Sequence, residues 1–287
     1  MNSVQAKNII IDKVKGLPTL PGMMHQVLAL VQDEGTSARR LGNLISHDQA
    51  ISSRLLKVAN SAYYGLMREI ATVQHAIVIL GFKEVKSLTL GITVFDAINK
   101  TNEQVFFNRE EFWMHSIGCA LAGQIICNKI RGVDAETTFT AALLHDIGKL
   151  VLDSFFTQEY EKVLDRVHTN GMSIVEAEDK VMGFNHANVG GLLCERWKFP
   201  ATLVIPINFH HQLEKVDIKH MQVTAIVHLA DILCKRAQIG NGGDNQIPPL
   251  HQLAKKHLKL EKRDIDTMVE KLKQEKEKVT SFLCSIQ

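Results

Sequence analysis

The chain has 287 residues, with 33 Lys and Arg against 31 Asp and Glu, so its net charge is +2. This balance argues against a dedicated nucleic-acid-binding protein, which usually carries a basic surplus. The 6% aromatic content argues against a stacking surface for single strands. The five cysteines form no CxxC pair, which argues against a disulfide framework or a zinc ribbon and suits a reducing cytoplasm. No apolar stretch is long enough for a membrane span, so we expect a cytoplasmic protein without a nucleic-acid partner.

Capping residues followed by apolar residues at helical spacing predict helices along the whole chain. In the first part, the expected helices are one carrying Val27–Val31 after Pro21, one carrying Leu41–Ile45 after Ser37, one carrying Ile51–Ala59 after Asp48, one from Thr72 to Leu80 closed by Gly81, and 82–98. In the second part, they are one opened by Asn108 with Glu111, 135–149 after Asp134, one from Ser173 to Gly183, one from Asn185 to Trp197, one from Pro200 to His210, and 219–237. Strand-like alternation is weak, so the expected fold is all-α, a multi-helix bundle.

Three segments are expected. An N-terminal helical subdomain (1–107) packs on a second helical subdomain (108–240), and a loop with a C-terminal helical tail (241–287) follows. In the first subdomain, the polar residues Asp48, Asn60, Ser61 and Tyr64 lie in an apolar helical context. They could form a surface that receives a partner, but capping and a turn are the favoured interpretation.

The chain holds 13 histidines, and His145 and Asp146 are adjacent. Lys149 lies four residues after His145 and three residues after Asp146, so on a continuous helix the three side chains would share a face. The flanking residues 141–144 are apolar, so burial of the pair is expected. A buried carboxylate beside an imidazole is costly unless a cation or a simple His–Asp hydrogen bond compensates. For the pair alone, the hydrogen bond is the favoured interpretation.

Further candidate ligands lie in helices with apolar faces. They are His115, His186, His210, His211 and Asp231. Each alone is interpreted as an ordinary core or rim residue, but with His145 and Asp146 they make five His and two Asp. This set suits one or two divalent ions of Fe, Mn, Zn or Co. Two such ions can clamp a phosphoryl group, and Lys149 could then stabilise developing negative charge.

The order His115, His145-Asp146, His186, His210-His211, Asp231 resembles the HD superfamily of metal-dependent phosphohydrolases. In the N-terminal half, the segments Leu17–Pro21, Ser46–Gly65 and Ala76–Gly81 resemble the HDOD family, the HD-related output domain. The resemblance covers roughly residues 17–235. It implies an all-helical bacterial protein of signalling and regulation, with an N-terminal subdomain of HDOD type and an HD-like second subdomain.

The resemblance also implies roles for single residues. His115, His145, Asp146 and Asp231 match the four ligands of the first HD metal. His186, His210 and His211 fall where second-metal ligands come, and Lys149 matches a lysine that contacts phosphate. We therefore expect Lys149 and Asp146 to be the catalytic residues of any reaction.

One departure concerns the substrate. The branch that degrades cyclic di-GMP follows its paired histidines with Arg-x-Asp-Gly-x-Gly-Tyr-Pro, whereas His211 precedes Gln-Leu-Glu-Lys-Val-Asp217, without Gly or Pro. This argues against hydrolysis of cyclic di-GMP. Two hypotheses stay open. The first is a signalling module with protein partners and an HD-type metal site. The second is an active phosphodiesterase or nucleotidase that takes a nucleotide or phosphoester. A helical DNA-binding regulator is a poor third, because the charge is near neutral and no recognition helix is evident.

Overall fold

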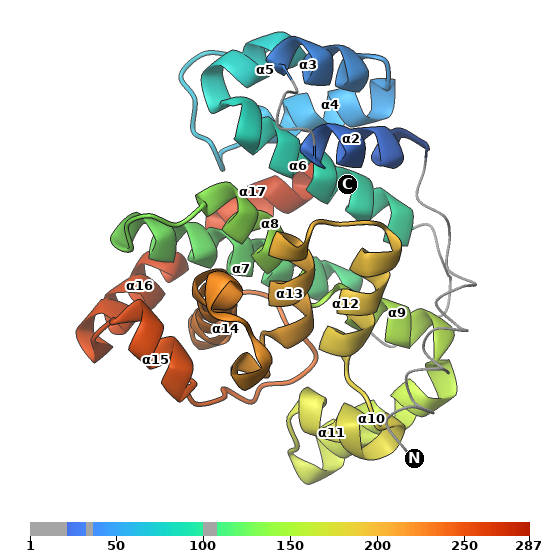
Figure 1. Cartoon of the computed structure of the whole chain (residues 1–287), viewed down its shortest axis with the longest axis vertical. Coiled ribbons are helices and arrows are strands. Elements are labelled where there is room, and N and C mark those ends of the chain that lie inside the picture. Colours follow the sequence, from blue (N-terminus) through green and yellow to red (C-terminus); the bar gives the residue numbers. More distant parts are fainter. Residues whose placement is uncertain (1–21, 33–36, 100–107) are drawn as a thin grey trace. The chain divides into compact units, whose positions relative to one another are not determined.

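The computed structural model describes residues 22–32, 37–99 and 108–287. Within these ranges the structure contains helices and no strand, which confirms the all-α prediction. The described residues fall into two compact units (Figure 1). The small unit comprises 22–99 and Gln274–Gln287, and the large unit comprises 108–273. In the part of the chain that is described, no helix has the length and apolar character to cross a bilayer.

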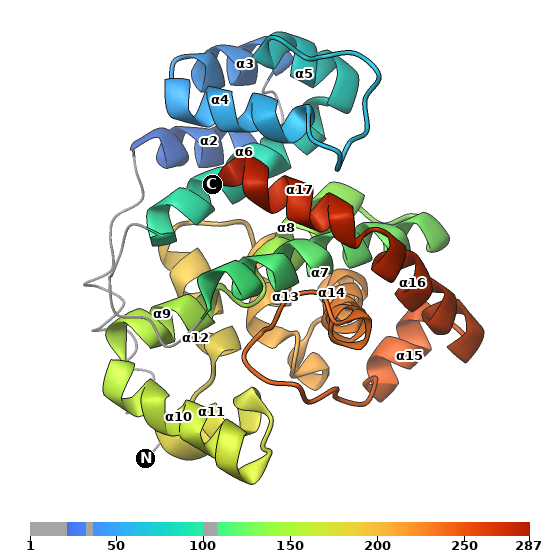
Figure 2. The same cartoon turned by 180° about the vertical axis from the view of Figure 1, so that it is seen from behind.

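The small unit joins the two ends of the described chain. Its helices are α2 (Gly22–Gln32), α3 (Ala38–Ser46), α4 (Gln49–Ala59), α5 (Val73–Leu80), α6 (Phe82–Asn99) and α17 (Lys276–Ile286). The last helix packs against α4 (Figure 2), and the rings of Tyr63 and Phe282 meet edge to face with centroids 5.1 Å apart. The C-terminal helix therefore shares a core with the N-terminal helices. The three sequence-based segments, with boundaries after residues 107 and 240, stay predictions.

Helix starts in the small unit follow the expected capping chemistry. The side chains of Ser37, Asp48 and Thr72 each accept a hydrogen bond from the backbone N–H three residues later. Gly81 ends α5 with a φ of 95°, a conformation that favours glycine. These four sequence predictions are confirmed. Pro21, expected in the first turn of α2, lies outside the described residues.

The other polar residues of this unit hold its loop together. Asn60 exchanges two hydrogen bonds with the backbone of Ile70, Ser61 donates to the carbonyl of Val58, and the Tyr64 hydroxyl donates to Glu84. With Asp48 capping α4, all four residues have structural partners. The expected cap at Asp48 and the turn at Asn60 and Ser61 are therefore confirmed.

The large unit carries the site. Its helices are α7 (Arg109–Lys129), α8 (Ala135–Leu144), α9 (Ile147–Phe155), α10 (Thr157–Asn170), α11 (Ile174–Met182), α12 (His186–Arg196), α13 (Ala201–Phe209), α14 (Ile218–Ala237), α15 (Gln252–Leu258) and α16 (Lys262–Gln274), with the 3-10 turn Leu213–Lys215 before α14. The expected caps Asn108, Asp134, Ser173 and Asn185 all accept backbone hydrogen bonds. Helix α7 packs on α8 and α14, and α12 packs on α9 and α13.

One helix prediction was wrong. The sequence predicted one helix over 135–149, but α8 ends at Leu144 and α9 begins at Ile147. Asp146 begins α9 with φ −97° and ψ 4°, and its side chain caps no backbone N–H. Its carboxylate is turned to other polar groups, described below. His145 therefore lies in the break and Lys149 lies on α9, so the two do not share one helix face, although the side chains of Asp146 and Lys149 still meet.

Helix α9 approaches α12 closely at Gly148. A Cβ atom at this position would lie 2.0 Å from the His186 carbonyl oxygen and 2.7 Å from the Gly190 nitrogen. Only glycine permits this approach of two backbones. The approach brings the start of α12, with His186, beside the break between α8 and α9, which contains His145 and Asp146.

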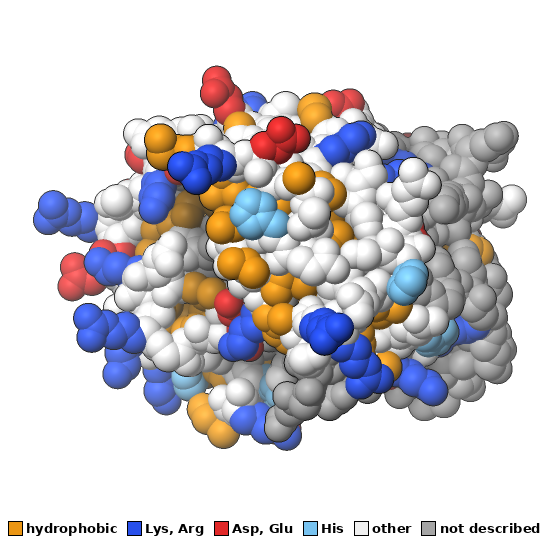
Figure 3. Space-filling view, turned by 90° about the horizontal axis from the view of Figure 1, so that it is seen from above, with side chains coloured by type: hydrophobic (Ala, Val, Ile, Leu, Met, Phe, Trp, Pro, Cys, Tyr) orange, Lys and Arg blue, Asp and Glu red, His pale blue; other side chains and the backbone are white. Residues whose placement is uncertain are grey.

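Some hydrophobic side chains remain at the surface. Figure 3 shows one face of the molecule, on which hydrophobic side chains lie among Lys, Arg and polar side chains. In the small unit, Met67 is fully exposed and Val78 largely so. In the large unit, by contrast, Trp113 and Trp197 are both buried.

Candidate metal centre

The structure brings all seven predicted ligand residues together inside the large unit. Helix α7 supplies His115, the α8–α9 break supplies His145 and Asp146, and α14 supplies Asp231. His186 begins α12, and His210 and His211 follow α13. All are buried except His211, which is half-buried. Their ligand roles stay predictions, but their convergence is a property of the fold.

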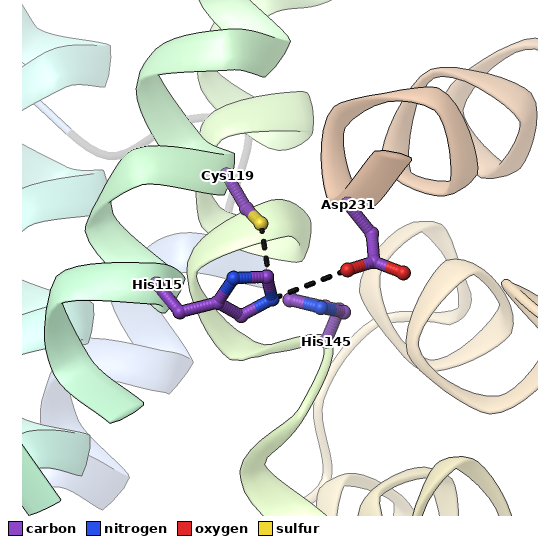
Figure 4. A group of neighbouring side chains, drawn as sticks. All are labelled: His115, Cys119, His145 and Asp231. Carbon is purple, nitrogen blue, oxygen red and sulfur yellow. Dashed lines mark hydrogen bonds and ion pairs between the residues drawn. The ribbon is translucent and has the colours of Figure 1, made fainter. Parts of the chain in front are cut away.

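The side chains form two groups among the described residues. The first group is His115, Cys119, His145 and Asp231, and the second is Asp146, His186, His210 and His211. Within each group, one ligand atom of every residue lies within 4.8 Å of the others. Figure 4 shows the first group, with the imidazoles of His115 and His145 and the Asp231 carboxylate turned toward one another.

Asp146 lies between the two groups. Its Oδ2 atom is 3.3 Å from His145 Nε2 and 3.7 Å from His115 Nε2, both in the first group. Its Oδ1 atom is 3.0 Å from His186 Nε2 and 3.8 Å from His210 Nε2 in the second. One carboxylate therefore faces both groups, with one oxygen toward each.

Hydrogen bonds at the far ring nitrogens orient three of the histidines. His145 Nδ1 lies 2.7 Å from the Ala142 carbonyl oxygen, and His210 Nδ1 lies 2.9 Å from the Ile207 carbonyl oxygen. Because a carbonyl only accepts, Nδ1 is the donor in both rings. Their Nε2 lone pairs are then free for a ligand inside the cluster. His186 Nδ1 lies 2.6 Å from Glu178 Oε2, a carboxylate partner of the kind that supports metal-bound histidines.

The residues fit a divalent cation. Four buried atoms, His145 Nε2, Asp146 Oδ1, His210 Nε2 and Asp231 Oδ1, make no hydrogen bond in the part of the chain that is described, although each faces a His or Asp of the cluster at 3.0–3.8 Å. Leaving buried polar atoms unpaired is costly, of order 1–3 kcal/mol each. All four are atom types that bind metals, and all four point into the cluster, so a cation would satisfy them together.

The protonation states of Asp146, His210 and His211 suit metal binding, whereas a metal at His115 would displace a proton. Burial and the neighbouring histidines hold the pKa values of His210 and His211 well below the usual range, so both rings are neutral at pH 7. Burial raises the pKa of Asp146, but His145 and Lys149 outweigh it and hold the pKa well below its usual value. Asp146 is therefore a carboxylate. Burial lowers the pKa of His115, but Cys119 and Asp231 outweigh this and raise it to about 10.

These pKa shifts predict how the stability of the metal-free protein depends on pH. Below pH 6.5, the usual pKa of histidine, the unfolded chain binds protons that folded His210 and His211 do not, so stability falls as the pH falls. Above pH 6.5 the sign is opposite, because the His115 pKa of about 10 means that the folded protein holds the extra proton. In chelator, we expect thermal stability to be highest near pH 6.5. Thermal melts between about pH 5 and pH 8 check this. His210→Gln should flatten the acidic side, and an unchanged acidic side would contradict the assignment.

Lys149 and the loop after α14 close the cluster. The Lys149 amine is buried and donates to Asp146 Oδ2 at 2.5 Å and to the Gly242 carbonyl at 2.7 Å. We call residues 240–246 the strap. A Cβ at Gly242 would lie 3.1 Å from His115 Nε2 and 3.3 Å from Asp146 Oδ2, so the strap passes directly over the ligands.

Sequence reasoning missed three parts of this centre. Cys119 lies four residues after His115 in the sequence, and this i+4 spacing was a usable signal that was not used. Glu178 lies eight residues before His186, and nothing local marks it as the partner of that ring. The strap was predicted as a loop, but its contact with the ligands depends on tertiary packing and has no sequence signal.

The Glu178 contact gives a direct prediction. Glu178→Gln removes the charge that orients His186, and we expect the affinity for metal at the second group to fall by about 10- to 100-fold. Competition with a fluorescent chelator measures this. Glu176→Gln, on the same helix but exposed, is the matched control and should keep the affinity of the unmodified protein. Equal affinities in both variants would show that Glu178 does not support the site.

An all-helical fold with a converging His/Asp centre defines an HD-type protein. The family model of the HDOD domain matches residues 17–213, and the chain belongs to the HDOD family. This confirms the resemblance noted in the sequence.

Known proteins resemble the chain at modest identity. A Treponema pallidum (strain Nichols) protein is 23% identical over 234 residues. The match covers 78% of this chain but only 43% of the length of that protein. An HDOD domain protein from Geobacter sulfurreducens has 22% identity and a TM-score of 0.81, with 99% of this chain and 98% of that one covered. A candidate signal transduction protein from Marinobacter aquaeolei VT8 has 17% identity and a TM-score of 0.82, with 100% and 66% covered. These structures show that the fold is shared.

Proposed function

We propose that this chain is a regulatory protein of bacterial signal transduction, acting through protein partners, whose HD-type centre holds one or two divalent metal ions. Membership of the HDOD family and the fold shared with a candidate signal transduction protein support the signalling role. The convergence of seven candidate ligands supports the metal. The expected cytoplasmic location and the absence of a nucleic-acid partner belong to this proposal.

The proposal depends mainly on one observation, which is that the Lys149 amine and the ligand groups are covered by the strap and are not open to a substrate. The amine that an HD hydrolase would offer to a phosphate, that of Lys149, is occupied by Asp146 and the Gly242 carbonyl. The strap is held at both ends of its path. The Asn241 N–H donates to the Glu111 carbonyl at 3.0 Å, and Asp244 accepts from the Ile174 N–H at 2.8 Å and from Lys235 Nζ at 3.2 Å. A phosphoester could reach Lys149 only after these bonds break.

The second candidate is a metal-dependent phosphohydrolase, and one observation favours it. Lys149 Nζ lies 2.5 Å from the carboxylate that faces both ligand groups, so its charge is directed at the centre. Divalent ions at these groups would supply Lewis-acid chemistry to a phosphoryl group. Lys149 would bind the negative oxygens of that group, and the histidines and carboxylates would hold the ions.

A phosphodiesterase assay separates the two candidates. Protein purified without a histidine tag is supplied in turn with Fe²⁺, Mn²⁺, Zn²⁺ and Co²⁺ and given bis-p-nitrophenyl phosphate. The proposal predicts no turnover above that of Lys149→Met with any ion. Metal-dependent turnover that is lost in Lys149→Met and Asp146→Asn would overturn it in favour of the hydrolase. Turnover that arises only in Asp244→Ala, in which the strap loses an anchor, would indicate a hydrolase held closed.

A further inference from the structure

Cys119 belongs to the first ligand group by position, although the expected HD ligand set does not include it. It lies one turn after His115 on α7 and is fully buried. Its Sγ atom is 3.5 Å from His115 Nε2. Figure 4 shows the sulfur directed at the His115 ring, with Asp231 approaching that ring from another helix.

The spacing of the group matches that of a four-coordinate metal site. Zinc binds nitrogen at about 2.0–2.1 Å, sulfur at about 2.3 Å and carboxylate oxygen at about 2.0–2.2 Å. At tetrahedral angles, these lengths place nitrogen and sulfur about 3.6 Å apart and nitrogen and oxygen about 3.4 Å apart. The observed separations are 3.5 Å for His115 Nε2 to Cys119 Sγ and 3.2 Å for His115 Nε2 to Asp231 Oδ1.

The group also holds two buried atoms that make ion-pair contacts but no hydrogen bond. His145 Nε2 and Asp231 Oδ1 are buried and make no hydrogen bond within the described ranges. Both belong to the same four residues whose ligand atoms lie within 4.8 Å of one another. A cation placed among these four ligand atoms could therefore bind all of them.

Asp146 is the competing fourth ligand of this group, 3.3 Å from His145 Nε2, but it is also bound to groups outside it. Its Oδ2 atom accepts the Lys149 hydrogen bond at 2.5 Å and is 3.7 Å from His115 Nε2. Its Oδ1 atom faces His186 at 3.0 Å. Cys119 is closer to His115 than Asp146 is, and it has no lysine on its ligand atom.

We propose that Cys119 is a metal ligand, so that the first group is a two-histidine, cysteine and aspartate site for a thiolate-binding ion such as Zn²⁺, Co²⁺ or Fe²⁺. This rests on the metal-binding part of the proposed function and is independent of the signalling role. A sulfur ligand shifts selectivity away from Mn²⁺ and Mg²⁺, which suit all-oxygen and carboxylate sites. The metal of the first group is then set by one cysteine.

Cobalt substitution with X-ray absorption tests this. The Co²⁺ protein should show a thiolate-to-cobalt charge-transfer band, and the Zn²⁺ protein should show one sulfur neighbour in its absorption fine structure. Cys119→Ser should lose both signals, and its Zn²⁺ affinity at this group should fall at least about tenfold, the lower bound for losing even an outer-shell partner. Cys127→Ser, two turns further along α7, is the matched control and should keep both signals.

The outcomes are distinguishable. Metal bound without any sulfur neighbour in the unmodified protein, or with signals that survive in Cys119→Ser, overturns the proposal and leaves the metal-binding function standing. Failure of the unmodified protein to bind any metal overturns both. If Cys119→Ser does not fold, the wild-type sulfur signal together with its persistence in Cys127→Ser, Cys194→Ser, Cys234→Ser and Cys284→Ser assigns the ligand to Cys119 by elimination.

Discussion

Replacing Asp146 with asparagine is expected to remove metal from the second ligand group and to weaken metal binding at the first. The two carboxylate oxygens face different groups, at 3.3 Å from His145 Nε2 and 3.0 Å from His186 Nε2. An amide has no charge and offers one weak donor oxygen, so the second group loses its carboxylate ligand, whereas the first keeps Asp231. Elemental analysis after dialysis should find that the variant has lost at least the metal of the second group.

The same change should also destabilise the fold. Lys149 is buried and its amine is bonded to Asp146, so the variant leaves a buried cation without its counter-charge. Breaking a buried pair from one side costs about 3–5 kcal/mol. Asp165→Asn, at an exposed aspartate of α10, is the control and should change neither metal content nor stability. Full metal content in Asp146→Asn would show that this carboxylate is not shared by the two groups.

Replacing Gly148 with alanine is expected to be among the most destabilising single substitutions in the large unit. The new Cβ would lie 2.0 Å from the His186 carbonyl oxygen, which is backbone and cannot rotate away. Overpacking typically lowers the free energy of unfolding by about 1–3 kcal/mol. Because this clash is with backbone, we expect a loss of about 3 kcal/mol or more. Because His186 begins α12, the displacement also moves a candidate ligand, so the affinity for metal should fall with stability.

Urea unfolding followed by tryptophan fluorescence measures this effect, because Trp113 and Trp197 both lie in the large unit. Gly123→Ala on α7 is the matched control. Its Cβ would lie 3.3 Å from the Thr138 methyl group, 3.7 Å from the Ala142 methyl group and 3.9 Å from the Thr138 carbonyl oxygen. The gain in helix propensity of about 1 kcal/mol offsets that contact, so its stability should stay within about 1 kcal/mol of the unmodified protein. Equal midpoints for the two variants would contradict the close approach of α9 and α12.

Local chemistry explains which parts of the fold could be predicted. Ser37, Asp48, Thr72, Asn108, Asp134, Ser173 and Asn185 each cap the helix that the sequence assigned to them. Capping depends on residues within one turn, so it is legible in the sequence. The return of α17 to the N-terminal helices depends on contacts between distant residues, such as Tyr63 with Phe282, and no local pattern marks it.

The candidate centre divides in the same way. The order of the histidines and aspartates indicated which residues converge, because a buried charged group in an apolar helix needs a partner. The break at His145-Asp146 was missed because the apolar spacing continues through it, while the carboxylate is held by Lys149 and by histidines from α7 and α12. Glu178 and the strap act through contacts that span the fold.

Elemental analysis of the unmodified protein, purified without a histidine tag, decides whether the converging histidines and aspartates bind metal. We expect near-stoichiometric Fe, Mn, Zn or Co, one or two ions per chain, retained through dialysis. Correctly folded protein that carries no metal and takes up none when soaked with each ion would contradict it.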